Sequence, residues 1–148
     1  MKLYVIRHGN TDSNRLDIYN GKLLNEDINN IGIKQAQEAS KKIKNLNIDL
    51  IICSPLLRTR HTCDIINSNK IKVIYDDRIE ERNCGVLTNT KIDNFYYTEY
   101  WNYYSKVKID NLETVPELFK RVNLFLDEIK KKYRGQNILL VTHGGVAR

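Results

Sequence analysis

The sequence predicts an α/β protein with a doubly wound, mostly parallel sheet and helices on both faces. Short and nearly continuous apolar runs, such as residues 2–6 and 49–53, are typical of strands buried on both faces. Amphipathic stretches with apolar residues at spacings of three and four separate these runs, as crossover helices do. The order strand, helix, strand, helix, strand, excursion, helix, strand fits a single domain over residues 1–148.

The first strand is expected at residues 2–6, followed by a polar loop over 10–30. Asn30 or a neighbour is expected to cap a helix over residues 32–43. Its apolar residues share one face: Ile33, Ala36, Ala39, Ile43 and Leu46.

A helix start is expected directly after the second strand, residues 49–53. Ser54 is a suitable N-cap, and Pro55 suits the first helical position. This start places Arg58 in the first turn of the next helix, at the carboxyl end of the strand. Amide donors and the helix dipole favour an anion there.

The third strand is expected at residues 71–75, before a long irregular excursion over residues 78–91. Residues 92–106 are dense in tyrosine around Trp101. We expect one or two helices there, folded over the site.

The last helix and strand have clear boundary signals. Thr114 and Glu117 form a capping box, and Gly135 ends the helix that follows. The predicted buried stripe of this helix is Val115, Leu118, Val122, Leu126, Ile129 and Tyr133. The final strand is the apolar run 137–142.

Composition narrows the function classes. The formal net charge of +6 comes from lysines scattered over helix faces, which favours solvation over nucleic-acid binding. No apolar run approaches the roughly 20 residues that span a bilayer, and no cleavable signal is evident, so we expect no membrane partner and a cytoplasmic location. The three cysteines lack metal-type spacing and are expected to be reduced. The oligomeric state stays open.

Histidines follow two of the predicted strands. Arg7 and His8 end the first run, and His143 ends the last, each histidine being followed by glycine. Ligands bind at the carboxyl ends of strands in open α/β sheets. If the two runs are neighbouring parallel strands, both histidines meet in one pocket, with Arg58, Asn14 and a glutamate of the 80s nearby.

This set of side chains suits phosphoryl transfer. Catalysis of that step consists mostly of positioning and of cationic stabilisation of the phosphoryl oxygens, which two arginines and a histidine supply without a metal. A neutral imidazole is a competent covalent nucleophile, so His8 is expected to carry a phosphohistidine. The leaving alcohol needs a proton, for which Glu80 and Glu81 are the candidates.

Two other roles are possible for the histidines. They could be core residues bonded to backbone, but the paired context disfavours this. They could also bind metal with Asp12, although a dication beside Arg7 and Arg58 would be repelled.

Four motifs, in order and at suitable separations, resemble the histidine phosphatase superfamily in its phosphoglycerate mutase-like branch. The resemblance runs from Lys2 to the last residue. It rests on residues 3–11 with their Arg-His-Gly core, on Asn14, on residues 54–59, on Glu81 four residues before Gly85, and on residues 142–145.

The resemblance implies a role for each site residue. It implies that His8 takes the phosphoryl group, that Arg7, Arg58 and His143 bind it, and that Asn14 lies near the phosphate pocket. Family spacing selects Glu81 over Glu80 as the proton donor, and Arg82 is similar to a substrate-binding arginine of the mutases. Members of this superfamily generally need no metal or other cofactor.

The chain also departs from the family pattern. Asn10 stands where Glu or Gln is usual, Cys84 where mutases tend to have Tyr, and residues 87–89 where a glycine normally closes the excursion. The sequence stops at Arg148, so we expect a phosphoglycerate mutase-like fold that is truncated at the C-terminus and lacks the usual last helix and strand.

The predicted function is a metal-independent phosphatase acting on small phosphomonoesters through a phosphohistidine on His8, with Glu81 as proton donor. Two alternatives stay open. One is a phosphoglycerate mutase, which the departures disfavour more than a hydrolase, and the other is a catalytically silent module that binds phosphate or a partner.

Overall fold

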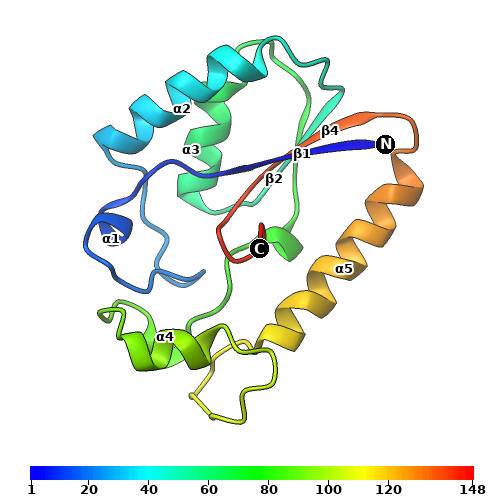
Figure 1. Cartoon of the computed structure of the whole chain (residues 1–148). Coiled ribbons are helices and arrows are strands. Elements are labelled where there is room, and N and C mark those ends of the chain that lie inside the picture. Colours follow the sequence, from blue (N-terminus) through cyan, green and yellow to red (C-terminus); the bar gives the residue numbers. More distant parts are fainter.

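Four strands form one sheet in the computed structural model, in the order β1-β4-β2-β3 (Figure 1). The model describes the backbone of residues 1–148 and the side chains of all of them except residues 94–96. Every described strand pair is parallel. The strands are β1 (Lys2–Arg7), β2 (Leu50–Cys53), β3 (Val73–Tyr75) and β4 (Asn137–Thr142).

Helices cover both faces of this sheet, which confirms the doubly wound α/β prediction. Side chains alternate between the faces along each strand. Ile51 and Leu139 pack with α2 (Asn30–Ile43) and α3 (Leu57–Ile66) on one face. Ile52 and Leu140 pack with α5 (Val115–Lys132) on the other. Figure 1 shows α2 and α3 together on one side of the strands and α5 on the opposite side.

Two helix starts lie where the sequence signals put them. The Asn29 side chain caps α2 by accepting from the backbone N–H groups of Ile31 and Gly32. At α5 the Thr114 hydroxyl accepts from the backbone N–H of Glu117, and the Glu117 carboxylate accepts from the backbone N–H of Thr114. Phe125 is fully buried in α5 although it was not in the predicted stripe.

The start of α3 differs from the prediction. The helix begins at Leu57, with Leu56 as a cap that makes no side-chain hydrogen bond. The Ser54 hydroxyl accepts from the backbone N–H of Leu56 at 3.5 Å and also lies 2.8 Å from Nε2 of His143. A remote loop supplies the acceptor for the first helical N–H, since Oδ1 of Asn25 accepts from the N–H of Leu57 at 2.7 Å.

The predicted loop over residues 10–30 contains one short helix, α1 (Asp12–Arg15). Thr11 and Asn14 form a capping box around it. The sequence pattern missed α1 because four residues are too few to show helical periodicity.

The region after β3 is irregular, as predicted. Two single 3₁₀ turns lie in it, η1 (Asp77–Ile79) and η2 (Gly85–Leu87), and they are followed by α4 (Asn94–Tyr100). One helix thus occupies the tyrosine-rich stretch, and part of the expectation for this stretch falls on the side chains of residues 94–96, outside the described set.

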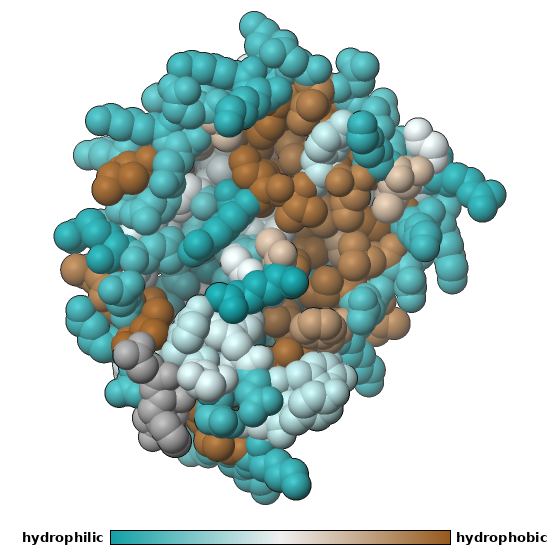
Figure 2. Space-filling model, viewed as in Figure 1, coloured by the Kyte–Doolittle hydropathy of each residue, from teal (hydrophilic) through white to brown (hydrophobic). Residues whose placement is uncertain are grey.

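An apolar area extends over the surface near β1 and α5 (Figure 2). The expectation that residues 2–6 form a strand buried on both faces is wrong, because β1 is an edge strand and its Val5 is 50% exposed. A hollow of about 170 Å³ beside α5 is lined mostly by apolar side chains and reaches Gly145 and Val146 after β4. No helix in the described part of the chain has the length and apolar character to cross a membrane.

Candidate active site

His8 and His143 meet at the carboxyl end of the sheet. β1 and β4 are parallel neighbours whose last paired residues are Arg7 and Thr142, so each histidine directly follows the paired region. The backbone N–H of His8 donates to the Thr142 carbonyl at 3.0 Å, which extends the ladder by one bond. The ring centroids lie 5.1 Å apart at 58°. Strand register therefore brings together the two imidazoles that the sequence predicted as neighbours.

His8 is held as a neutral imidazole. Its Nδ1 lies 2.7 Å from the Gly9 carbonyl oxygen, which can only accept, so Nδ1 carries the proton and Nε2 keeps a lone pair. Burial lowers the pKa of His8 to about 3, and the positive charges of Arg58 and Arg7 act in the same direction. The ring is therefore neutral, with a lone pair on Nε2, over the ordinary pH range.

His143 is fully buried beside it. Its Nε2 is hydrogen-bonded to the Ser54 hydroxyl at 2.8 Å, whereas Nδ1 has no partner within the described structure. Burial, followed by the charge of Arg58, holds the pKa of His143 well below its usual value. An imidazole nitrogen that is buried and unpartnered is ready to contact a ligand oxygen.

Arg58 reaches the same place from the first turn of α3 and is fully buried. Nη1 donates to the Leu24 carbonyl at 3.1 Å and Nη2 to the Gly21 carbonyl at 2.6 Å. Its Nε has no partner among the described residues. Two carbonyls of the 20s loop thus orient the guanidinium and leave part of its donor fork unused.

A pocket of about 180 Å³ opens beside the two histidines. Arg7, Asn14 and Glu81 line it together with Gly144 and Gly145. His8, Arg58 and His143 are not part of this lining, because they are buried behind it. The pocket nevertheless adjoins them, since Arg7 precedes His8 and Gly144 follows His143 in the chain.

Glu81 faces this pocket from the loop after β3. Both of its carboxylate oxygens accept from the backbone N–H of Gly145 at 3.2 Å, and Oε1 also accepts from the N–H of Arg82 at 2.9 Å. A Cβ atom at Gly145 would collide with Oε1 of Glu81 and lie 3.0 Å from Trp101. Glycine at this position therefore lets the carboxylate approach the end of β4.

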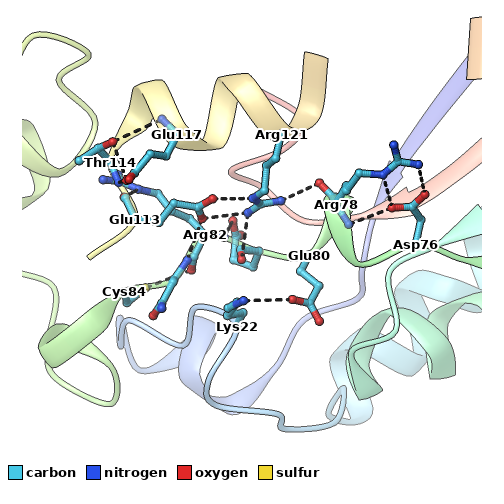
Figure 3. Close-up of polar contacts among 12 residues, drawn as sticks. Lys22, Asp76, Arg78, Glu80, Arg82, Cys84, Glu113, Thr114, Glu117 and Arg121 are labelled. Carbon is cyan, nitrogen blue, oxygen red and sulfur yellow. Dashed lines mark hydrogen bonds and ion pairs between the residues drawn. The ribbon is translucent and has the colours of Figure 1, made fainter. Parts of the chain in front are cut away.

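Glu80 points elsewhere and forms an ion pair with Lys22 at 3.6 Å (Figure 3). It is not among the residues that line the pocket. The placement of these two glutamates agrees with the choice of Glu81 as the candidate acid.

Arg82 lies outside the pocket lining, contrary to its expected place beside a substrate. The side chain is buried, its Nε donates to the Glu113 carbonyl at 2.5 Å, and Nη1 donates to the Tyr100 carbonyl. The guanidinium also lies 4.0 Å from the centre of the Tyr100 ring. In this structure Arg82 joins the loop after β3 to the end of α4 and to the segment before α5, and the resemblance could not reveal that backbone carbonyls occupy two of its donors.

The structure adds residues that the sequence analysis did not select. Tyr97, Trp101 and Arg148 also line the pocket. The Arg148 guanidinium donates to the Tyr97 hydroxyl at 2.7 Å and lies 4.3 Å from the centre of the Trp101 ring. No sequence signal joins these residues, because α4 and the chain after β4 are distant in sequence.

Thr62 is a second addition, and here a signal existed. Its hydroxyl accepts from the backbone N–H of Gly9 at 3.0 Å and donates to the Arg58 carbonyl at 2.7 Å. Thr62 follows Arg58 by four residues on α3, so helical spacing places both on one face. It fixes the glycine that follows His8.

The described site residues do not form a cluster of metal ligands. Within the described part of the chain, no group of three or more His, Cys, Asp or Glu side chains is arranged to hold an ion. The three cysteines are buried and free.

Comparisons with known proteins give one consistent family. A family model of the histidine phosphatase superfamily (branch 1) matches residues 3–148. Phosphoserine phosphatase 1 of Hydrogenobacter thermophilus is 29% identical, with 97% of this chain and 71% of that protein covered. A protein named probable phosphoglycerate mutase GpmB of Yersinia pestis is 32% identical, with 97% and 70% covered.

Solved structures agree with these relatives. The alpha-ribazole phosphatase of Shigella flexneri superposes with a TM-score of 0.81 at 28% identity, with 99% of this chain and 76% of that chain covered. A phosphoserine phosphatase of Entamoeba histolytica, in complex with 3-phosphoglyceric acid, gives 0.83 at 25% identity, with 98% and 75% covered.

Proposed function

The chain belongs to the histidine phosphatase superfamily, and from this membership together with the site geometry we propose that it hydrolyses small phosphomonoesters through a phosphohistidine on His8. The observation that carries the proposal is the neutral His8 ring beside His143 and the buried charge of Arg58. Attack on a phosphoryl group requires a nucleophile with a free lone pair, here Nε2 of His8, and nearby donors that bind the phosphoryl oxygens.

In the first step Nε2 of His8 attacks the phosphorus atom, and the bond between phosphorus and the alcohol oxygen breaks. Glu81 gives its proton to the departing oxygen and becomes a carboxylate. Arg7, Arg58 and His143 bind the equatorial phosphoryl oxygens, where charge accumulates in the transition state. Asn14 contributes a further amide at the pocket.

In the second step the Glu81 carboxylate takes a proton from water, and the resulting oxygen attacks the phosphorus. The bond between phosphorus and nitrogen breaks, so His8 returns as a neutral ring and phosphate leaves. Each group ends in its starting state: Glu81 gives one proton to the alcohol and regains one from the attacking water.

The alcohol part of the substrate would lie against the wall formed by Tyr97, Trp101 and Arg148. The pocket of about 180 Å³ suits a small group. Two of the similar proteins are named for a small substrate of this kind, phosphoserine.

A phosphoglycerate mutase is the second candidate, favoured by the 32% identity to the protein named for that activity. A mutase must keep its phosphoenzyme from water and hold a second anionic group. Arg82, the residue expected to hold that group, donates to two backbone carbonyls instead. This contact pattern supports hydrolysis over transfer.

One assay separates these activities. The protein is incubated with p-nitrophenyl phosphate, phosphoserine and 3-phosphoglycerate, and both free phosphate and 2-phosphoglycerate are measured. The proposal expects phosphate release that is lost in His8→Asn, with little isomer formed. Predominant isomer formation would support the mutase, and no turnover of any compound would support a silent binding module.

A further inference from the structure

The candidate acid lies on a segment without regular structure. Glu81 belongs to residues 78–84, here called the acid loop, which run from the middle of η1 to the start of η2. The carboxylate contacts the Gly145 and Arg82 N–H groups, but these bonds do not explain how the loop backbone is held. A general acid must stay within hydrogen-bond reach of the leaving oxygen, so the position of this backbone matters.

Arg121 on α5 bonds directly to the acid loop. Its Nη1 donates to the Arg78 carbonyl at 2.7 Å, and its Nη2 donates to the Glu81 carbonyl at 3.3 Å. The guanidinium is also paired with Glu113, through Nε to Oε1 at 2.5 Å and Nη2 to Oε2 at 2.9 Å. Figure 3 shows Arg121 extending from the helix between Glu113 and the Arg78 backbone.

Glu113 binds the backbone of the acid loop at a residue beyond Glu81. Its Oε2 accepts from the backbone N–H of Asn83 at 3.1 Å, and its own N–H donates to the Asn83 carbonyl at 3.0 Å. The pair of Arg121 and Glu113 thus binds the loop backbone at residues 78, 81 and 83. Side-chain exposures of 22% for Arg121 and 15% for Glu113 place this pair partly inside the protein, where ion pairs are screened less.

We propose that Arg121, paired with Glu113, is a positioning residue for Glu81 in the reaction proposed above, on which this inference rests. It does not line the pocket and acts through the backbone that carries the acid. A planar fork that binds a carboxylate and two carbonyls at once fixes the loop in a way that lysine cannot reproduce. A displacement of about 1 Å at a reacting group costs about 100-fold in rate.

A purely electrostatic role is the competing explanation. The positive charge of Arg121 contributes to the low pKa of His143. Arg121→Lys keeps this charge and loses the fork, so this variant separates the two roles. Glu113→Gln weakens the same ion pair by changing the other partner, and residue 121 remains arginine.

The experiment compares two leaving groups. p-Nitrophenolate departs without a proton, whereas the alcohol of phosphoserine needs one. kcat/KM, which reports phosphoenzyme formation and not its hydrolysis, is measured on both substrates for wild type, Arg121→Lys, Glu113→Gln, Glu81→Gln and the double variant of Glu81 and Arg121. Arg134→Lys is the control, because Arg134 is an exposed arginine just after α5, outside both the acid loop and the pocket lining.

The expected loss for Arg121→Lys is about 10- to 100-fold on phosphoserine and less than about 3-fold on p-nitrophenyl phosphate. Glu113→Gln should show the same split in smaller degree, and Arg134→Lys should show none. Adding Arg121→Lys to Glu81→Gln should cause no further loss on phosphoserine, since the acid is already absent.

Equal losses on both substrates, a wild-type rate in Arg121→Lys, or losses that multiply in the double variant would overturn the positioning role. A Glu81→Gln variant without any leaving-group split would instead refute the acid itself. That result removes the proton-donor part of the proposed function, and the role of Arg121 with it.

Discussion

His8 and His143 stand at the ends of paired parallel strands. Glu81 instead stands in a loop that is held in place by the side chains of Arg121 on α5 and of Glu113. The first region, which includes Arg58, is called the phosphate side, and the second, with Glu81 and the acid loop, the acid side. Backbone ladders and burial fix the phosphate side. Long-range polar contacts, which single substitutions can remove, fix the acid side.

The two sides are expected to respond differently to substitutions of the residues that hold them. A strand end cannot shift without breaking several ladder bonds of the core, so the imidazole pair is pre-organised. A loop can shift by small amounts when one ion pair is lost, so the acid side is the adjustable part of the site. The predictions below probe each side separately.

The largest effect is expected at the acid side, from Glu81→Gln. Loss of the proton donor should reduce kcat/KM, which reports phosphoenzyme formation, by about 100- to 10,000-fold on phosphoserine and by less than about 10-fold on p-nitrophenyl phosphate. Glu80→Gln is the matched control, since Glu80 forms only an ion pair with Lys22 and lies outside the pocket lining. Comparable losses on both substrates would count against the division into two sides.

Arg58→Lys tests the phosphate side. The ammonium keeps the charge but loses the planar fork, so kcat should fall about 100- to 1,000-fold, and equally on both substrates. Arg60→Lys, at an exposed position on the same helix, is the control. A loss confined to phosphoserine would contradict the assignment of Arg58 to the phosphoryl group.

The phosphate side also predicts a pH dependence of stability. His8 stays neutral in the folded protein down to a pKa of about 3, whereas the unfolded chain binds that proton near pH 6.5. Acidification below pH 6.5 therefore favours the unfolded state, and the free energy of unfolding should fall by about 2 kcal/mol per buried histidine from pH 7 to 5. Urea denaturation at both pH values measures this fall.

The fall should be smaller in His8→Asn, because the unfolded state loses one proton-binding group. His61→Asn, which removes a half-exposed histidine away from the site, is the control for losing a histidine. An unchanged fall in His8→Asn would show that burial of this ring does not set the acid sensitivity.

The smallest effect is expected from Ser54→Ala. The Ser54 hydroxyl is hydrogen-bonded to Nε2 of His143, so its loss leaves a buried ring nitrogen without that partner. One such bond is worth about 1 kcal/mol, which corresponds to a loss of about 5- to 10-fold in kcat, equal on both substrates. Ser68→Ala, at an exposed turn, is the control, and a leaving-group split in Ser54→Ala would argue against this account.

The two sides also differ in how far the sequence could predict them. Buried strand runs predict the positions of His8 and His143, because parallel strands end at the same edge of a sheet. The capping box at Thr114 likewise predicts the start of α5, since the signal is local. Arg58 lies at the site although its helix begins later than expected, because α3 follows directly from β2.

The acid side was less accessible to sequence reasoning. Glu81 and Arg82 are adjacent, yet one faces the pocket and the other donates to the Glu113 and Tyr100 carbonyls. An irregular loop has no period from which to infer such orientations. The role of Arg121 and the meeting of Trp101 with Arg148 depend on contacts between distant segments, which composition and spacing do not reveal.

The most direct test of the account is the trapping of the phosphoenzyme. The protein is mixed with a phosphomonoester labelled in its phosphoryl group, quenched in alkaline denaturant and assayed for protein-bound label before and after acid treatment. The account predicts bound label that acid releases in wild type and that is absent in His8→Asn. Label that persists in His8→Asn, or a wild type that turns over substrate without ever carrying acid-labile label, would contradict it.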